Sequence, residues 1–128
     1  MGNNDARQLI MVVDDCEDIR ELVALQLTLL GYRVVEATNG FEAIELARKE
    51  CPALILMDIN MPALDGLAAT RYIREVEERC DVIIVAFSAL GSGDNRARAL
   101  EAGCDEFITK PMEMTRLSHL MTNLLSSA

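Results

Sequence analysis

The chain has 128 residues and a mass of 14.1 kDa, with 12 Lys and Arg residues against 21 Asp and Glu residues and a formal net charge of −9. This length suits one compact domain with a sizeable core, and a content of 51% hydrophobic and 26% charged residues excludes a disordered tail. A pI of about 4.5 excludes a free-standing nucleic-acid-binding protein, because that affinity needs clustered basic side chains.

The cysteines and the apolar runs exclude further classes of protein. Cys16, Cys51, Cys80 and Cys104 are widely spaced and form no Cys-x-x-Cys pair, which excludes a zinc site or a dense disulfide scaffold. We expect them to be buried apolar residues in a reducing compartment. No apolar run reaches the roughly 20 residues that cross a bilayer, and the first residues lack the features of a secretory signal. The sequence therefore predicts a single cytoplasmic domain over residues 1–128, with a core over about 9–125 and no membrane contact.

Five short runs rich in apolar residues predict β-strands. They cover residues 9–13, 34–35, 54–57, 82–87 and 107–109. Continuous apolar runs bounded by turn signals are typical of strands that are buried on both faces, as in parallel sheets.

Helical periodicity fills the intervals between these runs. It predicts helices over residues 19–30, 41–49, 67–78 and 94–102, and a last helix that Pro111 opens. In the first helix we expect one face to point inward, made of Ile19, Leu22, Val23, Gln26, Leu27 and Leu30. Strict strand–helix alternation predicts an α/β fold, with a parallel sheet, right-handed crossovers and helices on both faces.

Four of the predicted strands end in polar residues that can do chemistry: Asp14-Asp15, Asp58, Ser88 and Lys110. Ligands of such sheets bind beyond the carboxyl ends of the strands, so these side chains should converge. Two carboxylates about 5 Å apart repel each other by about 3 kcal/mol at an effective dielectric constant of 20. Magnesium, which prefers oxygen ligands, would relieve that repulsion, and Lys110 would contact an anionic oxygen. The sequence therefore predicts a magnesium and phosphoryl site with a carboxylate that can act as nucleophile.

Over about residues 9–125, the chain resembles the receiver domains of bacterial two-component response regulators. The resemblance implies a flavodoxin-like, doubly wound sheet of five parallel strands in the order 2-1-3-4-5, with five helices. The motifs that carry it are Asp14-Asp15, Met57-Asp58-Ile59-Asn60-Met61-Pro62 with the following Asp65-Gly66, Ser88-Ala89, and Lys110-Pro111.

The resemblance also implies a role for each acid. Asp58 would be the phosphoacceptor, and Asp15 and Asp58 would ligate Mg²⁺ directly, with Mn²⁺ as an alternative ion. The backbone carbonyl of Asn60 would complete the direct ligands, and Asp14 would act through bound water.

The remaining motif residues would handle the phosphoryl group and the response to it. Lys110 and Ser88 would each contact a phosphoryl oxygen, and the Lys110–Pro111 bond would be cis. Phe107 would be an aromatic switch that turns inward as Ser88 moves toward the phosphoryl group.

The function that the resemblance implies is a phosphorylatable signalling switch. It would take a phosphoryl group from a sensor histidine kinase or a histidine phosphotransfer protein. It would then change conformation at the face of the fourth helix, fifth strand and fifth helix to reach a downstream protein target. Such a domain is not a conventional enzyme, although it assists its own phosphorylation and dephosphorylation.

Several other interpretations stay open at this point. A magnesium-dependent phosphohydrolase with an aspartyl nucleophile usually carries a second acid two residues later, where this chain has Asn60. A flavin or nucleotide binder would need a Gly-rich loop after the first strand, where Asp14 and Asp15 would repel phosphate. The complete acid set disfavours a non-phosphorylatable adaptor, and the chain could also be a receiver fragment of a larger regulator or hybrid kinase. Taken singly, Asp14 or Asp15 would be a helix cap and Phe107 a core residue.

Overall fold

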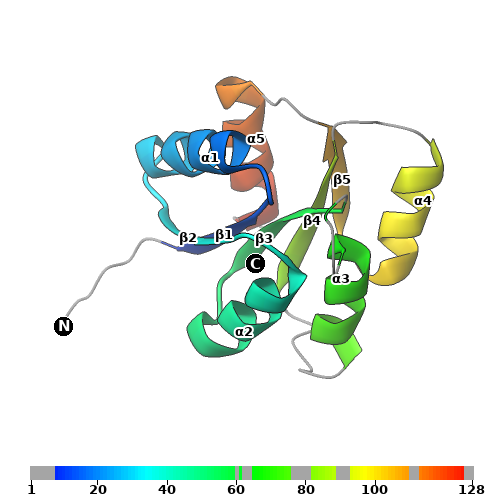
Figure 1. Cartoon of the computed structure of the whole chain (residues 1–128). Helices are drawn as coiled ribbons and strands as arrows, with labels where there is room; N and C mark the ends of the chain where they lie inside the picture. Colours follow the sequence, from blue (N-terminus) through cyan, green and yellow to red (C-terminus); the bar gives the residue numbers. More distant parts are fainter. Residues whose placement is uncertain are drawn as a thin grey trace.

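The strands of the computed structural model form one parallel sheet with the order β2-β1-β3-β4-β5 (Figure 1). The structure describes residues 8–59, 61, 65–75, 82–88, 93–109 and 113–125. The predicted fold class and strand order are confirmed. The strands are β1 (Leu9–Val13), β2 (Arg33–Ala37), β3 (Leu54–Asp58), β4 (Ile83–Ser88) and β5 (Glu106–Thr109).

A helix follows each strand, as the alternating pattern predicts. The predicted end of the third helix, at residue 78, and the opening role of Pro111 lie outside the described residues. Within the described part of the chain, no helix combines the length and the apolar character needed to span a membrane. The helices are α1 (Glu17–Leu29), α2 (Gly40–Glu50), α3 (Gly66–Glu75), α4 (Gly93–Ala102) and α5 (Met114–Leu125).

The sheet carries a buried apolar layer on each face, because successive side chains of a strand point to opposite sides. In β1, Ile10 and Val12 belong to the cluster that includes residues of α1 and α5. Met11 and Val13 belong to the cluster that includes residues of α2, α3 and α4. Figure 1 shows α1 and α5 on one side of the sheet and α2 and α3 on the other. The helices therefore leave the edge at the carboxyl ends of the strands as the place for a site.

One helix face differs from its prediction. Val23, Ala24 and Leu27 are the buried residues of α1, but Leu22 is 53% exposed. Leucines occur on both the inner and the outer side of this helix, so their spacing alone does not identify the side that packs on the sheet. Leu25 and Leu29 are exposed as well, on an outer side that also carries acidic residues.

The expectation that the cysteines are buried is wrong for two of them. Cys104 is buried, whereas Cys16 and Cys51 are exposed. Cys16 is the N-cap of α1 and Cys51 is the C-cap of α2, and both helix ends lie at the surface. Cys80 lies outside the described residues.

Candidate functional site

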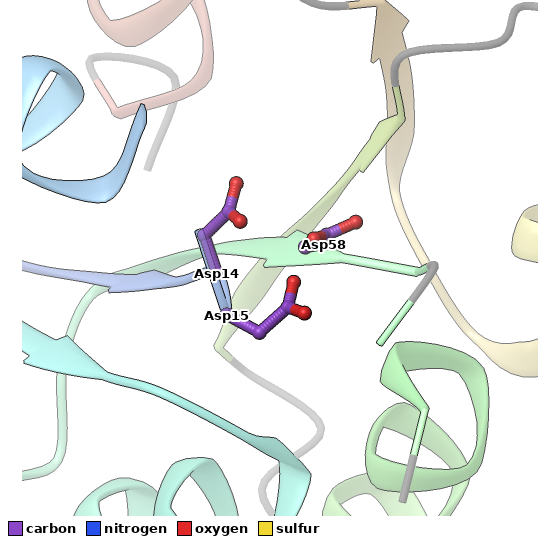
Figure 2. Close-up of side chains that lie close together, drawn as sticks. All are labelled: Asp14, Asp15 and Asp58. Atoms are coloured by element: carbon purple, nitrogen blue, oxygen red, sulfur yellow. The ribbon is translucent and has the colours of Figure 1, made fainter. Parts of the chain in front are cut away.

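Three carboxylates meet where the neighbouring strands β1 and β3 end. Asp14 and Asp15 directly follow β1, and Asp58 is the last residue of the neighbouring strand β3. One carboxylate oxygen from each residue lies within 4.8 Å of the other two. Figure 2 shows the three side chains converging from these two strand ends. The structure therefore brings together the acids that the strand pattern predicts to converge.

The backbone around Asp14 holds one of the two buried members of this acid cluster in place. Asp14 is fully buried, and its Oδ1 accepts a hydrogen bond of 2.9 Å from the backbone N–H of Cys16. Its own N–H donates to the carbonyl of Ala37 at the end of β2, and Arg20 Nη1 donates to its carbonyl oxygen, each at 3.1 Å. Asp15, in contrast, is exposed. The acid cluster thus has a fixed interior and an open side.

The backbone of Asp58 is held between β4 and the start of α3. Asp58 is 2% exposed and pairs in register with Phe87, whose carbonyl accepts the N–H of Ile59 at 3.2 Å. On the other side, Gly66 lies so close that a Cβ there would collide with the backbone oxygen of Asp58 and would lie 2.8 Å from Cγ of Met57. The position of Asp58 therefore depends on the absence of a side chain at Gly66.

Asp65 explains how α3 begins at this point. Asp65 Oδ1 accepts a 2.8 Å hydrogen bond from the backbone N–H of Ala68. This is the bond that an N-cap makes, because the first N–H groups of a helix have no partner within the helix. This helix-capping role was not predicted from the sequence, although Asp directly before an amphipathic run is a signal for it.

The acid cluster fits a hard divalent cation. Two carboxylates about 5 Å apart repel each other by about 3 kcal/mol at an effective dielectric constant of 20. Each pair in the acid cluster is therefore subject to a repulsion of this order. Their oxygens are the donor type that Mg²⁺ prefers, and Mg²⁺ binds through one or two carboxylates together with several waters. Exposed Asp15 provides the open side at which water and an anionic group can approach.

The other predicted site residues are placed as follows. Ser88 is the last residue of β4, fully buried, and directly follows the partner of Asp58 in the β3–β4 register. Phe107 lies in β5 opposite Ala86, is 8% exposed, and belongs to the cluster on the α2–α4 side of the sheet. Its position is that of a core residue, and its role as a switch stays a prediction. Asn60, Lys110 and Pro111 lie outside the described residues.

Comparison with known proteins identifies the family that carries such a site. The profile described as the response regulator receiver domain matches residues 10–122. A receiver domain of a sensor histidine kinase from Pseudomonas aeruginosa PAO1, solved with a magnesium ion in its active-site cleft, is 32% identical. The match covers 94% of this chain and 99% of the Pseudomonas receiver domain, with a TM-score of 0.87.

Curated relatives include both short and long proteins. The polar-differentiation response regulator DivK of Brucella anthropi is 31% identical over 93% of this chain and 97% of its own length. A probable transcriptional regulator, ycf27 of Porphyra purpurea, is 37% identical over 95% of this chain. The chain spans 49% of the length of that relative. On its sequence, its sheet order and these likenesses, the chain belongs to the receiver-domain family of response regulators.

Proposed function

We propose that this receiver domain accepts a phosphoryl group on Asp58 in a magnesium-dependent reaction and thereby acts as a signalling switch. The observation that carries the proposal is the convergence of Asp14, Asp15 and Asp58, whose carboxylate oxygens lie within 4.8 Å of one another. Asp58 is the proposed nucleophile because it ends the central strand β3 and its backbone is held on both sides.

The transfer itself needs position and charge neutralisation more than covalent help from the protein. A carboxylate oxygen of Asp58 forms a new P–O bond while the P–N bond of a phosphohistidine breaks, and the imidazole leaves. Bound Mg²⁺ would offset the negative charge of the acids and the phosphoryl oxygens. Asp14 and Asp15 would hold that ion with Asp58, and Mn²⁺ could replace it.

Three further residues complete the proposed machinery. Ser88 ends the strand beside Asp58, which suits a hydroxyl that donates to a phosphoryl oxygen. Lys110 would contact another phosphoryl oxygen and the carbonyl of Asn60 would join the metal ligands, as the family resemblance implies. The Lys110–Pro111 bond would be cis on the same ground, and Phe107 would be the switch residue.

The proposed partners follow from this chemistry. A sensor histidine kinase or a histidine phosphotransfer protein would supply the phosphoryl group, and a downstream protein target would read the phosphorylated state. We also propose a cytoplasmic location, which the exposed thiols of Cys16 and Cys51 support, because free surface thiols persist in a reducing compartment.

A labelling experiment with matched variants tests the proposal. Incubation with a small phosphodonor such as radiolabelled acetyl phosphate and Mg²⁺ should label the wild-type chain. Asp58→Asn should abolish labelling, because an amide is not a comparable nucleophile. Asp18→Asn should label normally, because this exposed acid on α1 lies outside the acid cluster.

Two outcomes would contradict the proposal. One is undiminished labelling of the Asp58→Asn chain. The other is sustained multiple turnover of phosphomonoesters by the wild-type chain, which would indicate a phosphohydrolase rather than a switch.

A further inference from the structure

Two exposed aromatic side chains gather on the α2–α3 side of the domain. Phe41 is 63% exposed and Tyr72 is 40% exposed, whereas Phe87 and Phe107 are both buried. A single exposed apolar residue is ordinary in a folded protein. Two aromatic residues from neighbouring helices that line the same hollow, however, form a patch that water does not favour.

The surface around Phe41 is hollowed on both sides. A hollow of about 380 Å³ lies between the two helices, lined by Phe41, Ile44, Glu45 and Arg48 of α2 and by Tyr72 of α3. A second hollow, of about 400 Å³, is lined by Phe41, Glu42, Glu45 and Leu46. The two hollows share Phe41 and Glu45 among their lining residues, so they adjoin each other. We call the two hollows together the α2–α3 groove.

Charge distinguishes the two hollows. The charged residues that line the second hollow, among those the structure describes, are the acids Glu42 and Glu45. Two hydrogen bonds from Thr38, from its N–H at 2.8 Å and its hydroxyl at 2.9 Å, hold the Glu42 carboxylate and lower the pKa of that group. Glu42 is therefore anionic at neutral pH, next to an aromatic ring. An aromatic face beside carboxylates is a favourable environment for an Arg or Lys side chain.

The hollow between the helices has a different character. Phe41, Ile44 and Tyr72 give it apolar and aromatic walls, and Arg48 lies seven residues after Phe41 on the same helix. Glu45 and Arg48 also line this hollow with opposite charges that offset each other, so that its apolar and aromatic walls favour an apolar side chain. The groove thus carries two adjacent subsites, one with a net negative lining and one with no net charge.

We propose that the α2–α3 groove is a protein-binding surface that takes a segment in which a basic side chain adjoins an apolar one. The basic side chain enters the hollow of Glu42 and Glu45, and the apolar side chain enters the hollow of Ile44 and Tyr72. Specificity comes from the carboxylates, and most of the contact area comes from Phe41 and Tyr72. This inference does not depend on the phosphoryl chemistry, and phosphorylation can succeed or fail independently of it.

Selection from a library of displayed random short peptides tests the proposal on the whole chain. Peptides selected on the wild-type protein should be enriched in Arg or Lys next to an aromatic or aliphatic residue. A synthetic copy of a selected peptide should bind at least about tenfold more weakly to Phe41→Ser and to Glu45→Lys than to the wild type. Leu25→Ser is the matched control, because it removes an exposed apolar side chain from α1 and should leave binding unchanged.

Each alternative occupant gives a different result. Acidic peptides, peptides that bind Phe41→Ser as well as the wild type, or no selected peptide would overturn the proposal. Concentration-dependent self-association in sedimentation that Phe41→Ser abolishes would assign the groove to a second copy, and would also overturn it. Cooperative urea unfolding of the Phe41→Ser and Glu45→Lys chains, with midpoints near that of the wild type, would show that both are folded.

Discussion

Gly66 is the residue on which the position of Asp58 depends most directly. A methyl group there would collide with the backbone oxygen of Asp58, so Gly66→Ala should displace the end of β3 or the start of α3. We expect a loss of stability of about 1–3 kcal/mol, typical of overpacking, together with reduced magnesium-dependent labelling. Denaturant unfolding and the labelling assay measure the two effects.

Gly31→Ala provides the matched control for Gly66→Ala. Gly31 has φ of 102° with open space around it, so that a methyl group meets only backbone strain, on the order of 1–2 kcal/mol. This variant should lose stability and keep its labelling. If Gly66→Ala labelled as well as Gly31→Ala, the proposed dependence of Asp58 on Gly66 would be wrong.

Single residues also mark how far the sequence could predict the structure. The convergence of Asp14, Asp15 and Asp58 was predictable, because the carboxyl ends of parallel strands share one edge whatever the loops do. The exposure of Leu22 was not, because leucines lie on both the inner and the outer side of α1 and only packing on the sheet selects one of them. The pairing of Phe41 with Tyr72 was equally hidden, because it depends on how two helices pack side by side.

At the scale of elements, α2 begins with a cap that reaches the groove. Asn39 Oδ1 accepts the N–H of Glu42 at 2.9 Å, and the Glu42 carboxylate in turn accepts from Thr38. The two hydrogen bonds from Thr38 to the carboxylate lower the folded-state pKa of Glu42 below its usual value of 4.5. The contribution of the carboxylate to stability is therefore complete above pH 4.5 and is lost as the pH falls through the lowered pKa.

The lowered pKa of Glu42 gives a prediction for the stability of Glu42→Gln. At pH 7 the variant should be less stable than the wild type by a few tenths of a kcal/mol, the scale of an exposed charge interaction. The difference should shrink as the pH falls below about 4.5, measured by urea unfolding over that range. A difference that grows toward low pH would contradict the assignment.

The attachment of α4 bears on the proposed conformational response. Among the side chains of α4 that the structure describes, the small Ala99 and Ala102 lie in the core, and Leu100 is 47% exposed. Arg74 of α3 ties the neighbouring connection in place by donating to the carbonyl of Gly103 at 2.9 Å and to the carboxylate of Asp105 at 2.8 Å. The described part of α4 thus contributes only small side chains to the core, which suits an element that would shift in the proposed response.

Hydrogen exchange tests that response. With beryllium fluoride and Mg²⁺ as a phosphoryl mimic, amides of α4, β5 and α5 should change their exchange rates, while those of β1 and β3 remain protected. The Asp58→Asn chain, treated in the same way, is the control and should not change. Identical exchange of the α4–β5–α5 face with and without the mimic would refute the proposed switch.

At the scale of the whole molecule, the net charge of −9 matters through its distribution. Three acids are concentrated at one edge of the sheet, two of them buried. In the metal-free state the carboxylates of the proposed site therefore repel one another. A cation that binds only the folded chain should offset this repulsion and stabilise the fold.

Because of this repulsion, we expect the difference in stability between the wild type and Asp58→Asn to depend on magnesium. Without Mg²⁺, Asp58→Asn should be more stable than the wild type by on the order of 1–3 kcal/mol, because it removes one like charge from the acid cluster. With Mg²⁺ at 100 times its dissociation constant, the wild type should gain about 2.7 kcal/mol and the variant much less. Thermal unfolding with EDTA and with Mg²⁺ measures both chains. Equal responses to Mg²⁺ in the two chains would exclude the acid cluster as the metal site.

The central claim is that the phosphoryl group is carried by Asp58, and chemical mapping tests it most directly. After labelling with acetyl phosphate and Mg²⁺, borohydride reduces an aspartyl phosphate to homoserine, and peptide mass spectrometry locates the change. Our account predicts homoserine at position 58, with none in a sample prepared without Mg²⁺. Homoserine at position 14 or 15 instead, or a labelled chain in which position 58 remains aspartate, would contradict it.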